Sequence, residues 1–135
     1  MYPGILLIDD DDDDQFIFLT ALENVAPDRH CDISNNALEA FQYLRARGEI
    51  PEMIFLDLNM PMINGFEFLL ILKSDPRFSP VPVIIFSTSD NPEDQARAKE
   101  LGALQFITKT ADIELLKKDL RFIFNKTEFI ESVIL

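Results

Sequence analysis

The sequence predicts an α/β fold in which a parallel sheet lies between two layers of helices. Three observations lead to this prediction: short apolar runs without polar alternation, helical spacing of apolar residues between those runs, and a regular succession of the two patterns. Runs that are apolar on both sides of the pleat are typical of strands buried on both faces, as in parallel sheets. Strands that alternate with helices imply right-handed crossovers within one sheet.

Five segments are predicted to be strands. Four of them are strongly apolar, and the remaining one is a weaker candidate because it is mixed in polarity. The four apolar runs are residues 5–8, 53–56, 83–86 and 104–107, and the weaker candidate is 30–33.

Five helices are predicted between and after these strands. They cover residues 14–25, a segment from about 35 to 48, residues 65–73, residues 91–101, and a last long helix from residue 113. In the second helix, Leu38, Phe41 and Leu44 recur every three residues, with two Asn residues before it and Gly48 at its end. In the last helix, apolar residues three and four apart predict an amphipathic helix; they are Ile113, Leu116, Leu120 and Ile123.

The fourth helix has clear start and stop signals. Asn91 is a suitable N-cap, Pro92 suits the first helical position, and two acidic residues follow in the first turn. Gly102 suits the position just after the helix. This helix has few large apolar residues, so we expect it to be loosely held.

Composition limits the classes of function. The chain has 135 residues, 12 Lys plus Arg and 24 Asp plus Glu, for a net charge of −12, which fits one globular domain. This charge opposes binding to nucleic acid or to anionic lipid. A single cysteine, Cys31, excludes a disulfide framework, and no apolar stretch reaches the roughly 18–20 residues that span a bilayer. We therefore expect a cytoplasmic protein.

Reactive polar residues follow the ends of the predicted strands. Asp9 and Asp10 follow the first strand, Asp57 the third, Ser87 and Thr88 the fourth, and Lys109 the fifth. Ligands of doubly wound sheets bind beyond the carboxyl ends of the strands, so these side chains should converge. Carboxylate oxygens suit Mg²⁺. A carboxylate beside a metal ion, an ammonium and a hydroxyl can attack phosphorus, because the cations neutralise the phosphoryl oxygens.

These motifs, taken together and in this order, resemble the receiver domain of two-component response regulators. The matching stretches are Ile8-Asp9-Asp10, the run from Leu56 to Pro61 followed by Gly65, Phe86-Ser87-Thr88, and Ile107-Thr108-Lys109. The resemblance implies a flavodoxin-like fold with strand order 2-1-3-4-5 and five flanking helices. It also implies a phosphoprotein of a phosphorelay, which acts as a phosphoacceptor and switch and not as an enzyme.

The resemblance also assigns roles to residues. It implies that Asp57 accepts the phosphoryl group to form an aspartyl phosphate, and that Asp10 binds Mg²⁺ directly with Asp9 assisting. The backbone carbonyl of Asn59 would be a further metal ligand, and Ser87 and Lys109 would contact phosphoryl oxygens. Pro61 and Gly65 would shape the loop after Asp57. A histidine kinase or a phosphotransfer protein would be the phosphoryl donor, and a downstream protein would be the target.

The sequence departs from the family pattern at two positions. Thr110 stands after Lys109 where the family usually has proline, so we expect a trans peptide there. Phe106 stands where the aromatic switch residue is often Tyr, so coupling to Ser87 would depend on packing alone. The Lys-Thr pair and the Ser-Thr-Ser stretch at 87–89 are similar to single-domain regulators that partner phytochrome-type histidine kinases.

Part of the acidic run has a simpler interpretation. We interpret residues 11–14 as a solvated, self-repelling run, with Asp14 or a neighbour capping the first helix. His30 and Cys31 are interpreted as ordinary strand residues, because they have no supporting third group for catalysis.

Two other functions are less well supported by the sequence. Ile8 to Asp11 also fits the nucleophile motif of haloacid dehalogenase-type Mg²⁺-dependent phosphohydrolases, but the acidic pair that such enzymes carry after the lysine is missing and a cap domain has no room. A receiver that no longer uses phosphate is disfavoured because all five site residues are intact: Asp9, Asp10, Asp57, Ser87 and Lys109.

The resemblance ends near Phe124, and we expect a receiver domain at 1–125. Residues 126–135 would extend the last helix, with no separate output domain. In this extension, four apolar side chains fall on one side of a helix; they are Phe129, Ile130, Val133 and Ile134. Two alternatives stay open: this side folds back onto its own domain, or it joins the last helix in a homodimer contact.

Overall fold

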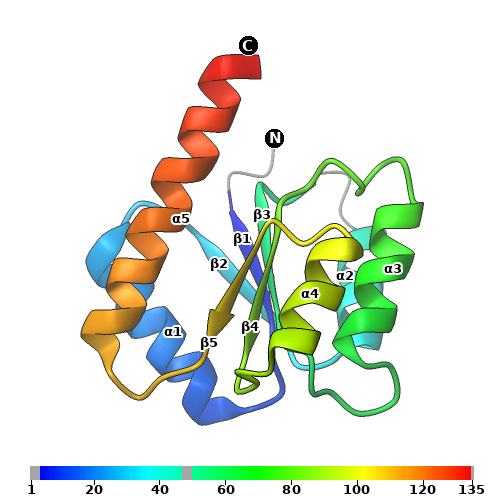
Figure 1. Ribbon diagram of the computed structural model, residues 1–135, viewed down its shortest axis with the longest axis horizontal. Coiled ribbons are helices and arrows are strands. Elements are labelled where there is room, and N and C mark those ends of the chain that lie inside the picture. Colours follow the sequence, from blue (N-terminus) through cyan, green and yellow to red (C-terminus); the bar gives the residue numbers. More distant parts are fainter. Residues whose placement is uncertain (1–3, 47–49, 135) are drawn as a thin grey trace.

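The chain folds into three layers with a parallel sheet in the middle (Figure 1). The structure is a computed structural model that describes residues 4–46 and 50–134, with side chains described as far as Thr127. Helices α1 and α5 cover one face of the sheet, and α2, α3 and α4 cover the other (Figure 1). This arrangement confirms the predicted fold class.

The sheet has five parallel strands in the order β2-β1-β3-β4-β5, as the family resemblance implied. They are β1 (Ile5–Ile8), β2 (Cys31–Ser34), β3 (Met53–Leu56), β4 (Val83–Ser87) and β5 (Gln105–Thr108). The two edge strands, β2 and β5, each begin and end one residue later than the apolar pattern predicts. Pairing with the neighbouring strand sets these limits, since Ile5 lies opposite Cys31 and Ile84 lies opposite Gln105.

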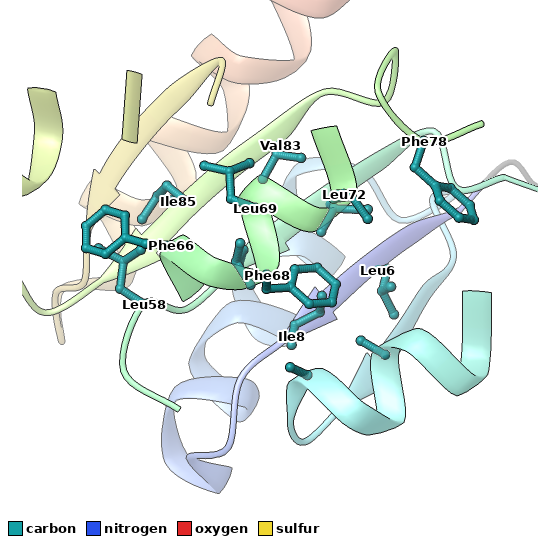
Figure 2. Packing of buried hydrophobic residues seen from close by; sticks show 14 of the residues in the cluster. Leu6, Ile8, Leu58, Phe66, Phe68, Leu69, Leu72, Phe78, Val83 and Ile85 are labelled. Atoms are coloured by element: carbon teal, nitrogen blue, oxygen red, sulfur yellow. The ribbon is translucent and has the colours of Figure 1, made fainter. Parts of the chain in front are cut away.

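Successive residues of the central strands point to opposite faces and enter two separate apolar clusters. On the face covered by α2, α3 and α4, Leu6 and Ile8 of β1 pack in one cluster with Phe68 and Leu69 of α3, as Figure 2 shows. On the other face, Phe55 of β3 packs with the residues of α1 and α5. Burial on both faces explains why these strands are apolar at every position.

The helices are α1 (Asp12–Val25), α2 (Ala37–Ala46), α3 (Gly65–Ser74), α4 (Pro92–Glu100) and α5 (Ile113–Ile134). Helix α1 begins two residues before the predicted start at 14, because Asp11 is its N-cap and accepts a hydrogen bond from the backbone N–H of Asp14 at 3.0 Å. Helix α4 has the predicted signals: the Asn91 side chain accepts from the backbone N–H of Glu93, and Gly102 has a φ of 104°. Within α4 only Ala98 is buried, which fits the expected loose packing.

The apolar spacing predicted for the second helix is partly wrong. Leu44 is buried, but Leu38 is 51% exposed, and the buried face is completed by Ala37 and Ala40. Ala37 and Ala40 belong to the same apolar cluster as residues of β1, and the predicted spacing did not include them because it was based on large apolar residues. The predicted end of this helix, Gly48, lies outside the described residues.

The last helix continues to Ile134 and extends beyond the sheet (Figure 1). The side chains of Phe129, Ile130, Val133 and Ile134 lie outside the described ones, so the two alternatives for the tail stay open. None of the helices in the described part of the chain has both the length and the apolar character that a membrane crossing requires.

Candidate functional site

The carboxyl ends of the central strands bring the predicted site residues to one edge of the sheet. Pairing of the strands continues into the residues that follow them: the backbone N–H of Asp57 donates to Ile8 O at 2.9 Å, and that of Lys109 donates to Ser87 O at 2.7 Å. The reactive side chains therefore begin from a backbone that the sheet holds in place.

Three carboxylates meet at this edge. Asp9, Asp10 and Asp57 each offer an oxygen atom, and these atoms lie within 4.8 Å of one another. Asp9 and Asp57 are buried, at 0% and 3% exposure, whereas Asp10 is exposed. Burial raises the pKa of Asp57 to about 6, and it also raises the pKa of Asp9. The site therefore concentrates negative charge where water compensates it poorly.

Lys109 is the cation that faces this charge. Its side chain is only 8% exposed, and its Nζ lies 2.9 Å from Asp9 Oδ2, 2.8 Å from Asp14 Oδ2 and 3.5 Å from Asp57 Oδ2. Burial alone would lower the pKa of Lys109, but the close carboxylates of Asp14 and Asp9 outweigh burial and raise it. Lys109 is thus a permanently charged ammonium in the site.

The carboxylate cluster has the chemistry of a divalent cation site. Asp9 Oδ1 accepts from the backbone N–H of Asp11 at 3.0 Å. Asp9 Oδ2 is buried and, although it contacts the Lys109 ammonium, it accepts no well-directed hydrogen bond from the described residues. A buried carboxylate oxygen with unused lone pairs beside two other carboxylates is a suitable ligand for a hard cation. The residues present therefore fit a metal ion.

The loop after β3 supports Asp57. The backbone N–H of Asn59 donates to Asp57 Oδ1 at 3.2 Å, which fixes the orientation of the carboxylate. Gly65 lies against the same loop, and a Cβ at this position would come within 2.5 Å of Asp57 O and 2.7 Å of Leu58 Cα. A glycine is required here because the N-terminus of α3 packs directly on the backbone that follows Asp57.

The two predicted switch residues differ in burial. Ser87 is fully buried, and its Oγ accepts from the backbone N–H of Ser89 at 3.2 Å. Phe106 is only half-buried and packs at the margin of the cluster on the α3 and α4 side. The peptide between Lys109 and Thr110 is trans, as expected for a bond without proline.

Asp14 is the site residue that sequence reasoning misassigned. It was predicted to belong to a solvated run in which Asp14 or a neighbour caps α1; the neighbour Asp11 is the cap, but Asp14 is not simply solvated, because it forms an ion pair with Lys109. Knowing which aspartate caps α1 would have pointed to this role. With Asp11 as the N-cap, Asp14 falls in the first turn of α1, close to the carboxyl end of β1, where it can reach Lys109.

Residues 5–121 match the response regulator receiver domain family, and the chain belongs to that family. Rcp1 of Synechocystis sp. strain PCC 6803, named a response regulator, is 30% identical over 119 residues, which cover 84% of this chain and 81% of Rcp1. PilH of Pseudomonas aeruginosa is 40% identical over 73 residues, which cover 54% of this chain and 60% of the length of PilH.

Solved structures agree with this assignment. The phosphorylated cyanobacterial phytochrome response regulator RcpA superposes with a TM-score of 0.81 at 32% identity, over 91% of each chain. The Mn²⁺-bound form of Rcp1 has a TM-score of 0.78 at 29% identity, over 90% of this chain and 91% of that one. The chain is therefore a phosphoacceptor receiver and not a turnover enzyme, and the phosphohydrolase alternative is not supported.

Proposed function

We propose that the chain takes a phosphoryl group onto Asp57 from a phosphohistidine of a histidine kinase or phosphotransfer protein. The observation that carries this proposal is the position of Asp57: its carboxylate is buried between two further carboxylates and a buried ammonium. An Asp57 oxygen attacks phosphorus, a P–O bond forms as the P–N bond breaks, and the imidazole nitrogen keeps the electron pair and is then protonated.

Each neighbouring group has a part in this transfer. Lys109 Nζ would donate to one phosphoryl oxygen and the Ser87 hydroxyl to another, so that the charge of the transferred group is met on two sides. The backbone N–H of Asn59 holds the Asp57 carboxylate in one orientation. A protein surface with this much negative charge repels an incoming dianion, so these donors have to be in place before the reaction starts.

We propose that Mg²⁺ is held by the carboxylates of Asp9, Asp10 and Asp57 together with the backbone carbonyl of Asn59. The clustered oxygens and the unused Asp9 Oδ2 support this assignment, and the Mn²⁺-bound structure of Rcp1 is an example of a divalent cation bound by a relative. When bound, the ion supplies positive charge that neutralises phosphoryl oxygens.

For the donor, we favour a histidine kinase of the phytochrome type. The support is the similarity over 91% of the chain to a phytochrome response regulator. Phosphotransfer profiling tests this choice: each histidine kinase of the source genome is autophosphorylated and mixed briefly with the protein. We expect the fastest transfer from a phytochrome-type kinase, and preferential transfer from a kinase of another sensor class would contradict it.

For the output, we propose that phosphorylation draws Ser87 toward the phosphoryl group and lets Phe106 move into the vacated space. The half-buried position of Phe106 and the sparse packing of α4 support a bistable element here. Amide NMR shifts on phosphorylation should concentrate at residues 87–102 and 106–110. Shifts confined to the carboxylates would contradict this switch.

For the assembly, we propose a receiver unit at 1–125 and a homodimer that uses the extension at 126–135. The support is the continuation of α5 as a helix past the sheet (Figure 1). Light scattering should report a dimer for the full chain and a shift toward monomer for a chain that ends at Asn125. A monomeric full chain, with and without phosphorylation, would contradict this.

Intact mass spectrometry tests the central proposal. Incubation with acetyl phosphate and Mg²⁺ should add one phosphoryl group to the wild type, and removal of Mg²⁺ should prevent this. Asp57→Asn should take none, because an amide oxygen is a poor nucleophile. Labelling of Asp57→Asn to the level of the wild type would show that the acceptor is elsewhere.

A further inference from the structure

The shortest ion pair in the site does not involve the proposed phosphoryl acceptor. Lys109 Nζ lies 2.8 Å from Asp14 Oδ2 and donates a hydrogen bond to it, whereas its distance to Asp57 Oδ2 is 3.5 Å. We propose that Asp14 is a positioning residue that holds the Lys109 ammonium off the Asp57 carboxylate, where it can meet the oxygens of an incoming phosphoryl group. This inference rests on the proposed function.

Asp14 is itself fixed in place. Asp11 caps α1 through a hydrogen bond from the backbone N–H of Asp14, so the first turn has one geometry. The side chain of Asp14 is 26% exposed, intermediate between the buried Asp9 and the exposed Asp12 and Asp13. Of the aspartates at 11–14, only Asp14 has an ion pair with Lys109 among the described contacts.

The contacts of the ammonium group favour Asp14 over Asp57. Asp14 Oδ2 accepts a hydrogen bond from Lys109 Nζ at 2.8 Å, and Asp9 Oδ2 lies 2.9 Å from Nζ as an ion-pair partner. The Asp57 oxygen at 3.5 Å is beyond good hydrogen-bond distance, so the ammonium is not bonded to the proposed acceptor.

This arrangement favours transfer for two reasons. An ammonium bonded directly to Asp57 would occupy the oxygen that has to attack phosphorus and would weaken it as a nucleophile. A phosphoryl group on Asp57 extends outward from the carboxylate, so an ammonium set back from Asp57 meets the phosphoryl oxygens and not the nucleophile.

Asp9 has a second role, in the proposed metal site, that Asp14 lacks. Asp9 belongs to the carboxylate cluster that fits a cation, and a bound cation would compete with Lys109 for its oxygens. Asp14 lies outside that cluster. It therefore remains as an anchor for Lys109 when the metal site is filled.

The test compares Asp14→Asn with Asp13→Asn. Both variants remove one negative charge from the first turn of α1, but only the first removes the ion pair with Lys109. Phosphorylation by acetyl phosphate with saturating Mg²⁺ is followed by intact mass. An Asp57 oxygen attacks phosphorus, the P–O bond to acetate breaks, and acetate leaves with the electron pair. Asp14→Asn should be slower than Asp13→Asn by about 3- to 10-fold, the size of one charge-assisted hydrogen bond.

Two further measurements separate positioning from a general loss of structure. Asp14→Glu keeps the carboxylate, so it should restore much of the rate. The side-chain ammonium NMR signal of Lys109 should be observable in the wild type and in Asp13→Asn, and should shift or broaden in Asp14→Asn. Both measurements are made on the full chain, at a pH where urea denaturation gives the same midpoint for each variant and for the wild type.

The outcomes are distinct. Equal rates for Asp14→Asn and Asp13→Asn, or a faster Asp14→Asn, would overturn the role of Asp14 while leaving phosphorylation of Asp57 intact. An unchanged Lys109 signal in Asp14→Asn would also overturn it. A wild type that takes no phosphoryl group on Asp57 would instead refute the proposed function, and the inference would fail with it.

Discussion

The interior of the sheet and the carboxyl edge of the same strands bury different kinds of side chain. In β1 and β3, residues 5–8 and 53–56 are apolar and at most 2% exposed. The next residues, Asp9 and Asp57, are buried to a similar degree but are carboxylates. Burial of the apolar residues stabilises the fold, whereas burial of the very next residue raises the pKa of a carboxyl group.

Stability and function are therefore divided along β1 and β3. Apolar burial contributes roughly 1.5–3 kcal/mol for each large side chain, whereas a buried carboxylate costs free energy unless it is compensated. The Lys109 ammonium, 2.9 Å from Asp9 Oδ2 and 3.5 Å from Asp57 Oδ2, compensates part of this cost. We therefore expect truncation of interior side chains to lower the free energy of unfolding. Neutralisation of a buried carboxylate at the edge should raise it while impairing phosphorylation.

The largest expected effect lies in the interior. Phe55 is fully buried and packs edge-on against Phe18 at a centroid distance of 4.8 Å. Phe55→Ala should lower the free energy of unfolding by about 3–5 kcal/mol, because it removes the ring and leaves a cavity. Urea denaturation measures this. Leu115→Ala, at a position that is 52% exposed, is the control and should change it by less than about 1 kcal/mol.

The next effect lies at the junction between the two regions. Gly65→Ala places a Cβ within 2.5 Å of the carbonyl oxygen of Asp57, so the loop after β3 has to shift. We expect a loss of about 1–3 kcal/mol in unfolding free energy, the usual cost of overpacking, together with slower phosphorylation of Asp57. Urea denaturation and intact mass measure the two effects. An unchanged rate would mean that the loop position does not matter to the acceptor.

Neutralising a buried carboxylate at the edge of the sheet should raise the free energy of unfolding, in contrast to the two substitutions above. Burial raises the pKa of Asp57 to about 6, so the ionised carboxylate destabilises the fold at neutral pH. Asp57→Asn should therefore raise the free energy of unfolding at pH 7 without metal by about 1–3 kcal/mol, while abolishing phosphorylation. Asp28→Asn is the control, because that carboxylate is exposed in the turn after α1, and it should change the free energy of unfolding by less than about 0.5 kcal/mol.

The smallest effect concerns metal binding. Mg²⁺ at ten times its dissociation constant should stabilise the wild type by about 1.4 kcal/mol, because it binds only the folded state. Asp10→Ala should remove most of this gain, since Asp10 is one of the three clustered carboxylates, whereas Asp12→Ala should keep it. Thermal unfolding with and without Mg²⁺ measures the gain. Equal losses in both variants would show that the acidic run acts only as a diffuse charge.

Much of the fold could be predicted from the sequence because both-face burial leaves a clear pattern. Each apolar run at 5–8, 53–56 and 83–86 became a central strand. The edge strand β2 gave a weaker signal because it is mixed in polarity, and three of its four residues are only partly buried. The small residues Ala37 and Ala40, which bury the inner side of α2, were missed because close packing does not require large side chains.

The candidate site could be predicted as a set of strand-end residues but not as a network. The positions of Asp9, Asp57, Ser87 and Lys109 follow from where the strands end. The contact between Asp14 and Lys109 joins residues 95 positions apart and depends on which aspartate caps α1. Six successive identical residues offer no sequence contrast from which to choose that cap.

The pH dependence of the stability difference between Asp57→Asn and the wild type, without metal, tests the contrast between interior and edge most directly. Below about pH 3, Asp57 is protonated in both folded and unfolded states, so the difference should be small and constant. As pH rises toward about 6, only the unfolded state loses the proton readily, so the wild type should lose stability relative to the variant. Above this range the difference should again be constant. A stability difference that is flat from pH 4 to 8, or a variant less stable than the wild type at pH 7, would contradict the claim that the ionised Asp57 carboxylate destabilises the fold.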